Sequence, residues 1–266
     1  MHSTGGAGAA PRLILVDLDG TLVGTDGTVS PRNAAAIERA AADGARVVVA
    51  TGRPARIVTP LRASLGHTIA LCYNGAIVLD LATGDVLEAH VLDGAVFEDA
   101  VLQVRGRGLA FVVGVEGMPD VGIRGESAFR EGYDLPRGSL HEICDGPVVK
   151  GLIRVQPDQF EAVWDAFANG FSDALEVTRS GVEGLIEISR AGVSKGGVIA
   201  ALAEGWGIAP SEAIAFGDMP NDLAMFRWAG RSVAMGNAEP EVKLAATEVG
   251  GHHNDDAVAQ VLERWF

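Results

Sequence analysis

The first residues of the chain whose types and spacing suggest a reactive site are two aspartates, two positions apart. Asp17 and Asp19 follow an unbroken aliphatic run at residues 13–16 and precede a turn at Gly20. A run without polar alternation predicts a strand buried on both faces of a parallel sheet. Ligands bind open α/β sheets beyond the carboxyl ends of their strands, so the pair is expected at a site. A carboxylate nucleophile beside a second carboxylate is one interpretation, and a capping plus a turn aspartate is the other.

Three further polar clusters follow or open predicted elements in the same way. Two come directly after the expected strands at residues 46–50 and 213–216, and the third opens a helix that Ser194 can cap. Because the carboxyl ends of parallel strands meet at one edge of a sheet, all are expected to converge with Asp17 and Asp19. The residues concerned are Thr51, Lys195, Asp218, Asn221 and Asp222.

Alternating strands and helices predict the fold class. Aliphatic runs at residues 13–16, 46–50 and 69–72 are separated by helical stretches, the first of which begins at Pro31 behind Ser30. This alternation is typical of an α/β fold with a doubly wound parallel sheet. The pattern resumes near residue 194 and closes with an amphipathic helix expected over residues 256–266.

The middle of the chain follows a different rhythm. A hairpin is expected over residues 77–87, and a Gly-rich mixture of strands and helices follows it, which we interpret as an α+β insertion. Expected strands lie at 110–115, 148–155 and 185–189, and expected helices at 95–105 and 159–169. The predicted division is a disordered tail over residues 1–10, a core over 11–80 and 189–266, and an inserted domain over 81–188.

Composition narrows the possible partners and the compartment. The chain has 266 residues, 48% of them hydrophobic, and a formal net charge of −14, which disfavours nucleic-acid and anionic-membrane partners. No apolar run approaches the roughly 20 residues that span a bilayer. Cys72 and Cys144 lack metal-ligand spacing and are expected to be reduced, packed residues of a cytoplasmic protein. A monomer or a weak homo-oligomer is expected.

The polar clusters together resemble the four motifs of the haloacid dehalogenase superfamily. They read DLDGT at 17–21, ATGR at 50–53, VSKG at 193–196 and GDMPND at 217–222. Their order and the large insert resemble the Cof-type (subfamily IIB) phosphatases, as do NGA at 74–76 and NDDAV at 254–258. The resemblance spans nearly the whole chain. It implies a Rossmann-like core with an inserted C2-type α/β cap that sets substrate specificity.

The activity implied by this resemblance is phosphoric monoester hydrolysis. A Mg²⁺-dependent phosphatase of small phosphorylated metabolites, sugar phosphates above all, would work through an aspartyl-phosphate. Asp17 would be the nucleophile, and Asp19 the general acid and then the general base. A phosphomutase of the same superfamily remains an alternative, as does a catalytically silent sugar-phosphate-binding protein, although the latter should have lost a catalytic group.

Charge repulsion explains why such a site needs cations. Two unit charges about 4 Å apart repel by about 4 kcal/mol at an effective dielectric constant near 20, and a phosphate adds to this. We expect Mg²⁺ on the side chains of Asp17 and Asp218 and the backbone carbonyl of Asp19, with Asp222 holding a metal-bound water. The expected phosphate-binding residues are Thr51, Gly52, Lys195 and Asn221.

Three other polar positions carry weaker expectations. For Arg53, two residues beyond Thr51, two alternatives remain open: it contacts phosphate or substrate, or it contacts neither. The adjacent pair His252 and His253 is expected to be exposed, because neighbouring rings rarely chelate one metal. Lys150 in the insert is expected to be solvated.

Overall fold

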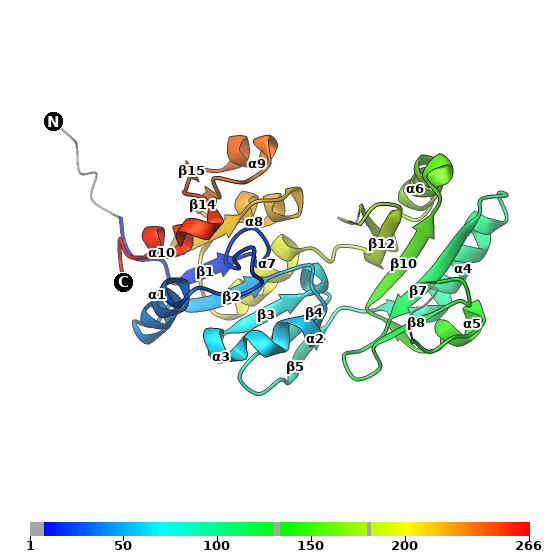
Figure 1. The fold of residues 1–266 in the computed structure, drawn as a ribbon, viewed down its shortest axis with the longest axis horizontal. Helices are drawn as coiled ribbons and strands as arrows, with labels where there is room; N and C mark the ends of the chain where they lie inside the picture. Colours follow the sequence, from blue (N-terminus) through cyan, green and yellow to red (C-terminus); the bar gives the residue numbers. More distant parts are fainter. Residues whose placement is uncertain (1–7, 67, 130–133, 180–181) are drawn as a thin grey trace. The chain divides into compact units, whose positions relative to one another are not determined.

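The chain folds into two compact units, each with its own sheet. The computed structural model describes residues 8–66, 68–129, 134–179 and 182–266. The core unit comprises Met1–Leu87 and Ser194–Phe266, and the inserted unit comprises Glu88–Val193 (Figure 1). The boundaries therefore follow Leu87 and Val193, seven and five residues beyond those expected from the sequence.

The later first boundary has a structural cause in the hairpin that follows the third strand. Strand β4 (Ile77–Asp80) pairs antiparallel with β3 (Ile69–Cys72), and β5 (Val86–Ala89) lies beside β4 at the edge of the same sheet. The hairpin at which the sequence pattern changes is thus part of the core sheet.

Strand β1 (Leu13–Val16) lies inside the eight-stranded core sheet. The strand order is β15-β14-β13-β1-β2-β3-β4-β5, with parallel pairing from β15 to β3 (Figure 1). All four β1 side chains are fully buried, as the aliphatic run predicts for a strand covered on both faces. The other strands are β2 (Arg46–Ala50), β13 (Ala213–Gly217), β14 (Arg231–Ala234) and β15 (Glu248–Val249).

Helices of the core unit begin where the sequence signals place them. Ser30 Oγ accepts a hydrogen bond from Asn33 N at the start of α1 (Pro31–Ala42), and Ser194 Oγ accepts one from Gly197 N at the start of α7 (Lys195–Gly205). The last helix is shorter than expected. The remaining helices are α2 (Ala55–Val58), α3 (Arg62–Leu65), α8 (Leu223–Trp228), α9 (Pro240–Ala245) and α10 (Ala257–Leu262). Short 3₁₀ turns are η1 (Thr59–Leu61), η2 (Tyr73–Gly75), η4 (Pro210–Glu212), η5 (Pro220–Asp222) and η6 (His253–Asp255).

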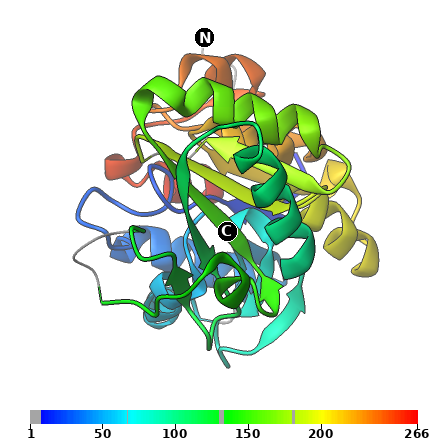
Figure 2. The same ribbon diagram turned by 90° about the vertical axis from the view of Figure 1, so that its right-hand side faces the viewer.

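The inserted unit is built on a five-stranded sheet in the order β11-β12-β10-β7-β8, in which every pair is antiparallel. Helices α4 and α6 share one apolar cluster with one face of this sheet, and Figure 2 shows both in front of its strands. The sequence predicts the long elements but misses β8 and β11, which have three and five residues and contain one and two aliphatic side chains. The strands are β6 (Leu92–Asp93), β7 (Phe111–Glu116), β8 (Ile123–Gly125), β9 (Pro147–Val148), β10 (Lys150–Val155), β11 (Leu175–Arg179) and β12 (Leu185–Arg190). The helices are α4 (Gly94–Arg105), α5 (Leu140–Ile143), η3 (Pro157–Gln159) and α6 (Phe160–Gly170).

Several expectations about single residues can be compared with the structure. Cys72 and Cys144 are free and buried, as predicted. Lys150 was expected to be solvated, which is wrong: it is buried, and its Nζ lies 2.5 Å from Glu187 Oε2 on the neighbouring strand, which compensates its charge. Among the described residues, no helix is both long and apolar enough to cross a membrane.

The expected disordered tail falls only partly within the described residues. Residues 1–7 lie outside them. The carbonyl of Gly8 accepts a hydrogen bond from Trp265 Nε1 at 2.7 Å, and that of Ala9 accepts one from Arg231 at 3.0 Å. The end of the expected tail is therefore hydrogen bonded to the core unit.

Two glycines of α7 should respond oppositely to the same substitution. A Cβ at Gly196 would overlap the backbone carbonyl of Ala224 in α8, whereas one at Gly205 meets nothing within 4 Å. We expect Gly196→Ala to lower the free energy of unfolding by about 1–3 kcal/mol through overpacking. Gly205→Ala should leave it unchanged or raise it by up to about 1 kcal/mol through helix propensity. Urea unfolding of both variants checks this; equal effects would contradict the close approach of α7 and α8.

Candidate active site

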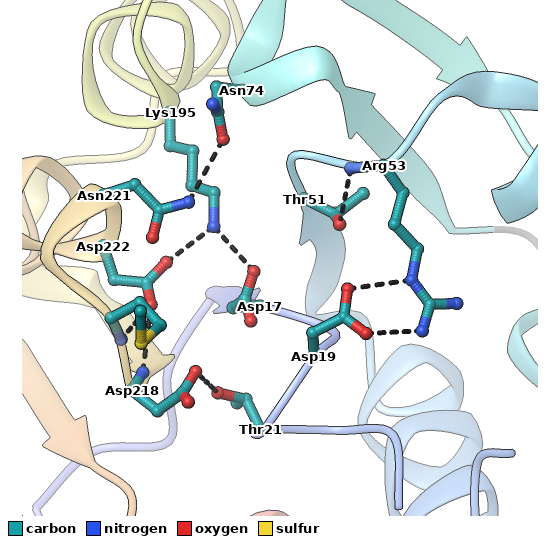
Figure 3. A network of polar contacts seen from close by, with 11 residues as sticks. Asp17, Asp19, Thr21, Thr51, Arg53, Asn74, Lys195, Asp218, Asn221 and Asp222 are labelled. Carbon is teal, nitrogen blue, oxygen red and sulfur yellow. Dashed lines mark hydrogen bonds and ion pairs between the residues drawn. The ribbon is translucent and has the colours of Figure 1, made fainter. Parts of the chain in front are cut away.

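The site lies at the carboxyl edge of the core sheet, where the register brings distant motifs level. Val16, the last residue of β1, is opposite Val49 in β2 and Phe216 in β13. The residues just beyond these positions, Asp17 and Asp218 among them, therefore lie at one edge. Figure 3 shows the predicted side chains gathered there. They are Asp17, Asp19, Thr51, Lys195, Asp218, Asn221 and Asp222, and Gly52 follows Thr51 in the chain.

A fully buried ammonium group lies between two carboxylates at the centre of the site. Lys195 Nζ donates to Asp17 Oδ1 at 2.6 Å and to Asp222 Oδ1 at 2.7 Å (Figure 3). The side chain of Lys195 has no exposed area, and Asp222 is likewise fully buried. Because Lys195 is the first residue of α7, the Ser194 cap that begins this helix also determines where its side chain enters the site.

Asp222 has both carboxylate oxygens occupied by protein donors. Its Oδ1 accepts from Lys195, and its Oδ2 accepts from the backbone amides of Asp218 and Met219, each at 3.0 Å. A Cβ at Gly217 would overlap this carboxylate, so the glycine is needed for the close approach. Asp222 therefore shapes the loop that carries Asp218 and orients Lys195.

Three carboxylates with one ammonium form a candidate metal site. Oxygens of Asp17, Asp218 and Asp222 all lie within 4.8 Å of one another. Thr21 Oγ1 donates to Asp218 Oδ1 at 3.2 Å and so orients that carboxylate. One lysine leaves the group with excess negative charge when all three carboxylates ionise. Oxygen ligands and excess negative charge suit a hard divalent cation, so the residues present fit such an ion.

Burial and crowding alter the ionisation of this group. Burial raises the pKa of Asp17 to about 8, with the charges of Asp222 and Asp218 adding to the effect and Lys195 opposing it. Burial, followed by the Asp222 charge, raises the pKa of Asp218 to about 6. Burial acts to lower the pKa of Lys195, but the two carboxylates outweigh it and raise that pKa above its ordinary value. Lys195 therefore stays charged at neutral pH.

The side chain of Asp19 does not belong to the group of three carboxylates but forms an ion pair with Arg53. Its carboxylate accepts from Arg53 Nε at 2.8 Å and from Arg53 Nη2 at 2.5 Å, and its side chain is 60% exposed. The backbone amide of Arg53 donates to Thr51 Oγ1 at 3.1 Å. In this structure, Arg53 therefore pairs with Asp19, a contact that the sequence analysis did not anticipate.

Sequence reasoning gave no role in the site to some polar residues that lie around it. Asn221 Nδ2 donates to Asn74 Oδ1 at 3.2 Å (Figure 3). Asn74 belongs to the NGA motif and lies two residues beyond the end of β3, a position that was the available signal. His253 was expected to be exposed, which is wrong: it is buried, and its Nδ1 lies 2.9 Å from the carbonyl oxygen of Val23. His252 is exposed as expected, and the centroid of its ring lies 4.7 Å from that of His253.

Comparison with protein families identifies the family of the chain. The model of the haloacid dehalogenase-like hydrolases matches residues 14–262, which is most of the chain. The chain belongs to this family. Three predictions made from the motifs are confirmed: the Cof-type subfamily, the α/β fold, and the class of enzyme, which is a phosphatase.

Curated relatives and solved structures align over nearly their whole length. The chain is 30% identical to a pyridoxal phosphate phosphatase of Escherichia coli, with 94% of this chain and 97% of that protein covered. It is 28% identical to a 5-amino-6-(5-phospho-D-ribitylamino)uracil phosphatase of Bacillus subtilis, with 96% and 98% covered. A haloacid dehalogenase-like hydrolase structure from Bacteroides thetaiotaomicron is 27% identical, with a TM-score of 0.78 and coverage of 96% and 100%.

The raised pKa of Asp17 predicts a specific pH dependence of stability in the metal-free protein. Between about pH 4 and about pH 8, the unfolded chain has lost the Asp17 proton while the folded chain retains it, so the free energy of unfolding falls as pH rises. Asp17→Asn removes this term. We expect the stability of the variant minus that of wild type to increase from pH 4 to pH 8 and then level off.

Urea unfolding in the presence of a chelator, across this pH range, measures that difference. Asp80→Asn in the β4–β5 hairpin is a suitable control, because Asp80 lies outside the carboxylate group. A difference between Asp17→Asn and wild type that does not change with pH would contradict the raised pKa.

Proposed function

We propose that the protein is a Mg²⁺-dependent phosphatase of small phosphorylated metabolites, with sugar phosphates as the expected substrates. The observation that carries the proposal is the buried Lys195 between Asp17 and Asp222, with Asp218 beside them at the carboxyl edge of the sheet. This arrangement offers one oriented carboxylate nucleophile, one fixed positive charge and an oxygen-ligand group for a cation.

Asp17 is the proposed nucleophile. Lys195 holds its Oδ1, whereas Oδ2 accepts no hydrogen bond from the described residues and is the oxygen expected to attack. In the first step an Asp17 O–P bond forms as the ester P–O bond breaks, and the leaving oxygen takes the electron pair and a proton from Asp19. In the second step Asp19 takes a proton from water as the water oxygen attacks phosphorus, which returns the Asp17 carboxylate and releases phosphate.

A cation is expected at the carboxylate group. Asp17 and Asp218 would hold it through their side chains and Asp19 through its backbone carbonyl, while Asp222 orients their surroundings and a metal-bound water. When bound, Mg²⁺ would offset the repulsion between carboxylates and phosphate and polarise the phosphoryl oxygens. The proposed phosphate-binding groups are the Thr51 hydroxyl, the Gly52 amide, the Lys195 ammonium and the Asn221 amide.

The comparisons support the proposed substrate class. Both relatives compared above are named for phosphate esters of small molecules, one of them a phosphoribityl compound. We infer that this chain acts on metabolites of similar size, and that the inserted unit selects among them. A polyhydroxylated leaving group is the expected choice.

Phosphate release tests the function directly. We expect wild-type protein to release inorganic phosphate from a panel of sugar phosphates, pyridoxal phosphate and p-nitrophenyl phosphate in Mg²⁺, and to lose this activity in a chelator. Asp17→Asn should lower turnover by at least about 10⁴-fold, because it removes the nucleophile. Its circular dichroism spectrum should match wild type, since the amide retains the shape of the carboxylate.

Three results would contradict parts of the proposal. Wild-type turnover in Asp17→Asn would exclude this nucleophile, and undiminished release in the chelator would exclude the metal. An isomerised sugar phosphate without free phosphate would identify a mutase instead.

The Arg53–Asp19 ion pair predicts an effect that depends on the leaving group. We propose that Arg53 positions Asp19 for proton transfer, so Arg53→Lys, which cannot form the two-pronged contact, should lower kcat. The loss should be about tenfold for a sugar phosphate and small for p-nitrophenyl phosphate, whose leaving group needs little protonation. Arg62→Lys in α3 serves as the control. An equal rise of KM for both substrates with unchanged kcat would instead show that Arg53 binds the phosphate.

A further inference from the structure

Asn237 is a polar residue beside the site that the proposed mechanism does not use. It follows β14 at the same sheet edge, and both ends of its side-chain amide are occupied. Its Nδ2 donates to the carbonyl of Gly20 at 2.8 Å and lies 3.4 Å from Asp218 Oδ2, and its Oδ1 accepts from the backbone amide of His253 at 3.0 Å. Contacts at both ends leave the amide one orientation.

The two groups that Asn237 joins are themselves in contact. Gly20 has a φ of +74°, and a Cβ there would overlap the Asp218 carboxylate. Gly20 belongs to the turn that carries Asp17 and Asp19, so Asn237 links this turn to the third carboxylate of the group. Thr21, in the same turn, donates to the other oxygen of Asp218. The Asp218 carboxylate is thus held on one oxygen by the turn and on the other by Asn237.

The C-terminal segment anchors the other end of this connection. His253 Nδ1 lies 2.9 Å from the Val23 carbonyl, and Asn254 Oδ1 accepts from the amide of Thr25 at 3.0 Å. Asp256, whose φ of +58° is uncommon for a residue with a side chain, accepts from Ser30 Oγ at 2.5 Å. Residues 253–256 therefore run along the loop of residues 20–30, and Asn237 connects this anchored loop to Asp218.

We propose that Asn237 is a positioning residue for the divalent cation, because it holds the Gly20 turn and the Asp218 carboxylate at the separation that a shared ion requires. The inference rests on the metal site of the proposed function. Asp17 and Asp218 repel each other when ionised, and their own turns are short loops. A donor that bridges the two turns opposes their separation. Partners that hold ligand groups in this way are worth about 10- to 100-fold in metal affinity.

Calorimetric titration of the metal-free protein with Mg²⁺, without substrate, tests the inference. We expect Asn237→Ala to raise the Kd for Mg²⁺ at least about tenfold. At saturating Mg²⁺ its substrate KM should stay close to wild type, because Asn237 contacts no proposed phosphate-binding group. Asn237→Ser, whose hydroxyl is too short to reach both partners, should show the same rise and serves if the alanine variant does not fold. Hydrogen exchange at the amides of residues 20–25 should become faster in both variants.

A matched control separates positioning from general loosening of the loop. Asn254→Ala removes a hydrogen bond to the same loop, at Thr25. The Asn254 side chain forms no hydrogen bond with Gly20 or Asp218, so the substitution leaves the contacts of Asn237 in place. We expect its Kd for Mg²⁺ to stay within about threefold of wild type. If wild type binds Mg²⁺ and a folded Asn237 variant binds it equally well, the inference about Asn237 is wrong while the metal site stands. If wild type binds no Mg²⁺, the proposed metal site fails, and the inference with it.

Discussion

The structure of the site depends on one buried ammonium group that faces more carboxylates than it can neutralise. Lys195 contacts Asp17 and Asp222 directly, whereas Asp218 lies in the same group and forms no ion pair with the described residues. The contacts of Lys195 join the strand that carries Asp17 to the loop that carries Asp222. Breaking either contact would leave a buried charge without its partner, which costs about 3–5 kcal/mol of stability.

The remaining negative charge gives the site its chemical character. Burial, with the repulsion between neighbouring carboxylates adding to it, raises the pKa values of Asp17 and Asp218. A divalent cation would offset the repulsion between these carboxylates by its positive charge, whereas a retained proton offsets it by neutralising one of them. The fold therefore keeps like charges close together, and hydrogen bonds hold them in place. Within the group, Asp222 accepts from the backbone amide of Asp218. From outside it, Thr21 and Asn237 contact the two oxygens of Asp218.

Local signals were sufficient for most of the core unit and insufficient for details of the insert. The aliphatic run of β1 and the Ser30–Pro31 cap predict their elements because strand burial and capping are properties of neighbouring residues. Lys150 was mispredicted because its ion-pair partner, Glu187, comes from a strand 37 residues away, and no local pattern announces that pairing. The expected boundary after residue 80 divided the hairpin and assigned β5 to the insert, whereas both β4 and β5 belong to the core sheet.

By itself, the sequence predicted the candidate site residues, the order of the motifs and most of the elements that carry them. The elements follow from periodicity and capping signals along the chain, whereas the candidate site residues follow from the motifs that resemble the family to which the chain belongs. Only the tertiary structure decided which residues share a hydrogen bond. Asp19 pairs with Arg53, and Asn237 reaches Gly20 and His253. Such contacts depend on the register between β1 and its neighbours and on the loop paths beyond the strand ends, because side chains distant in the chain meet only once the sheet has formed.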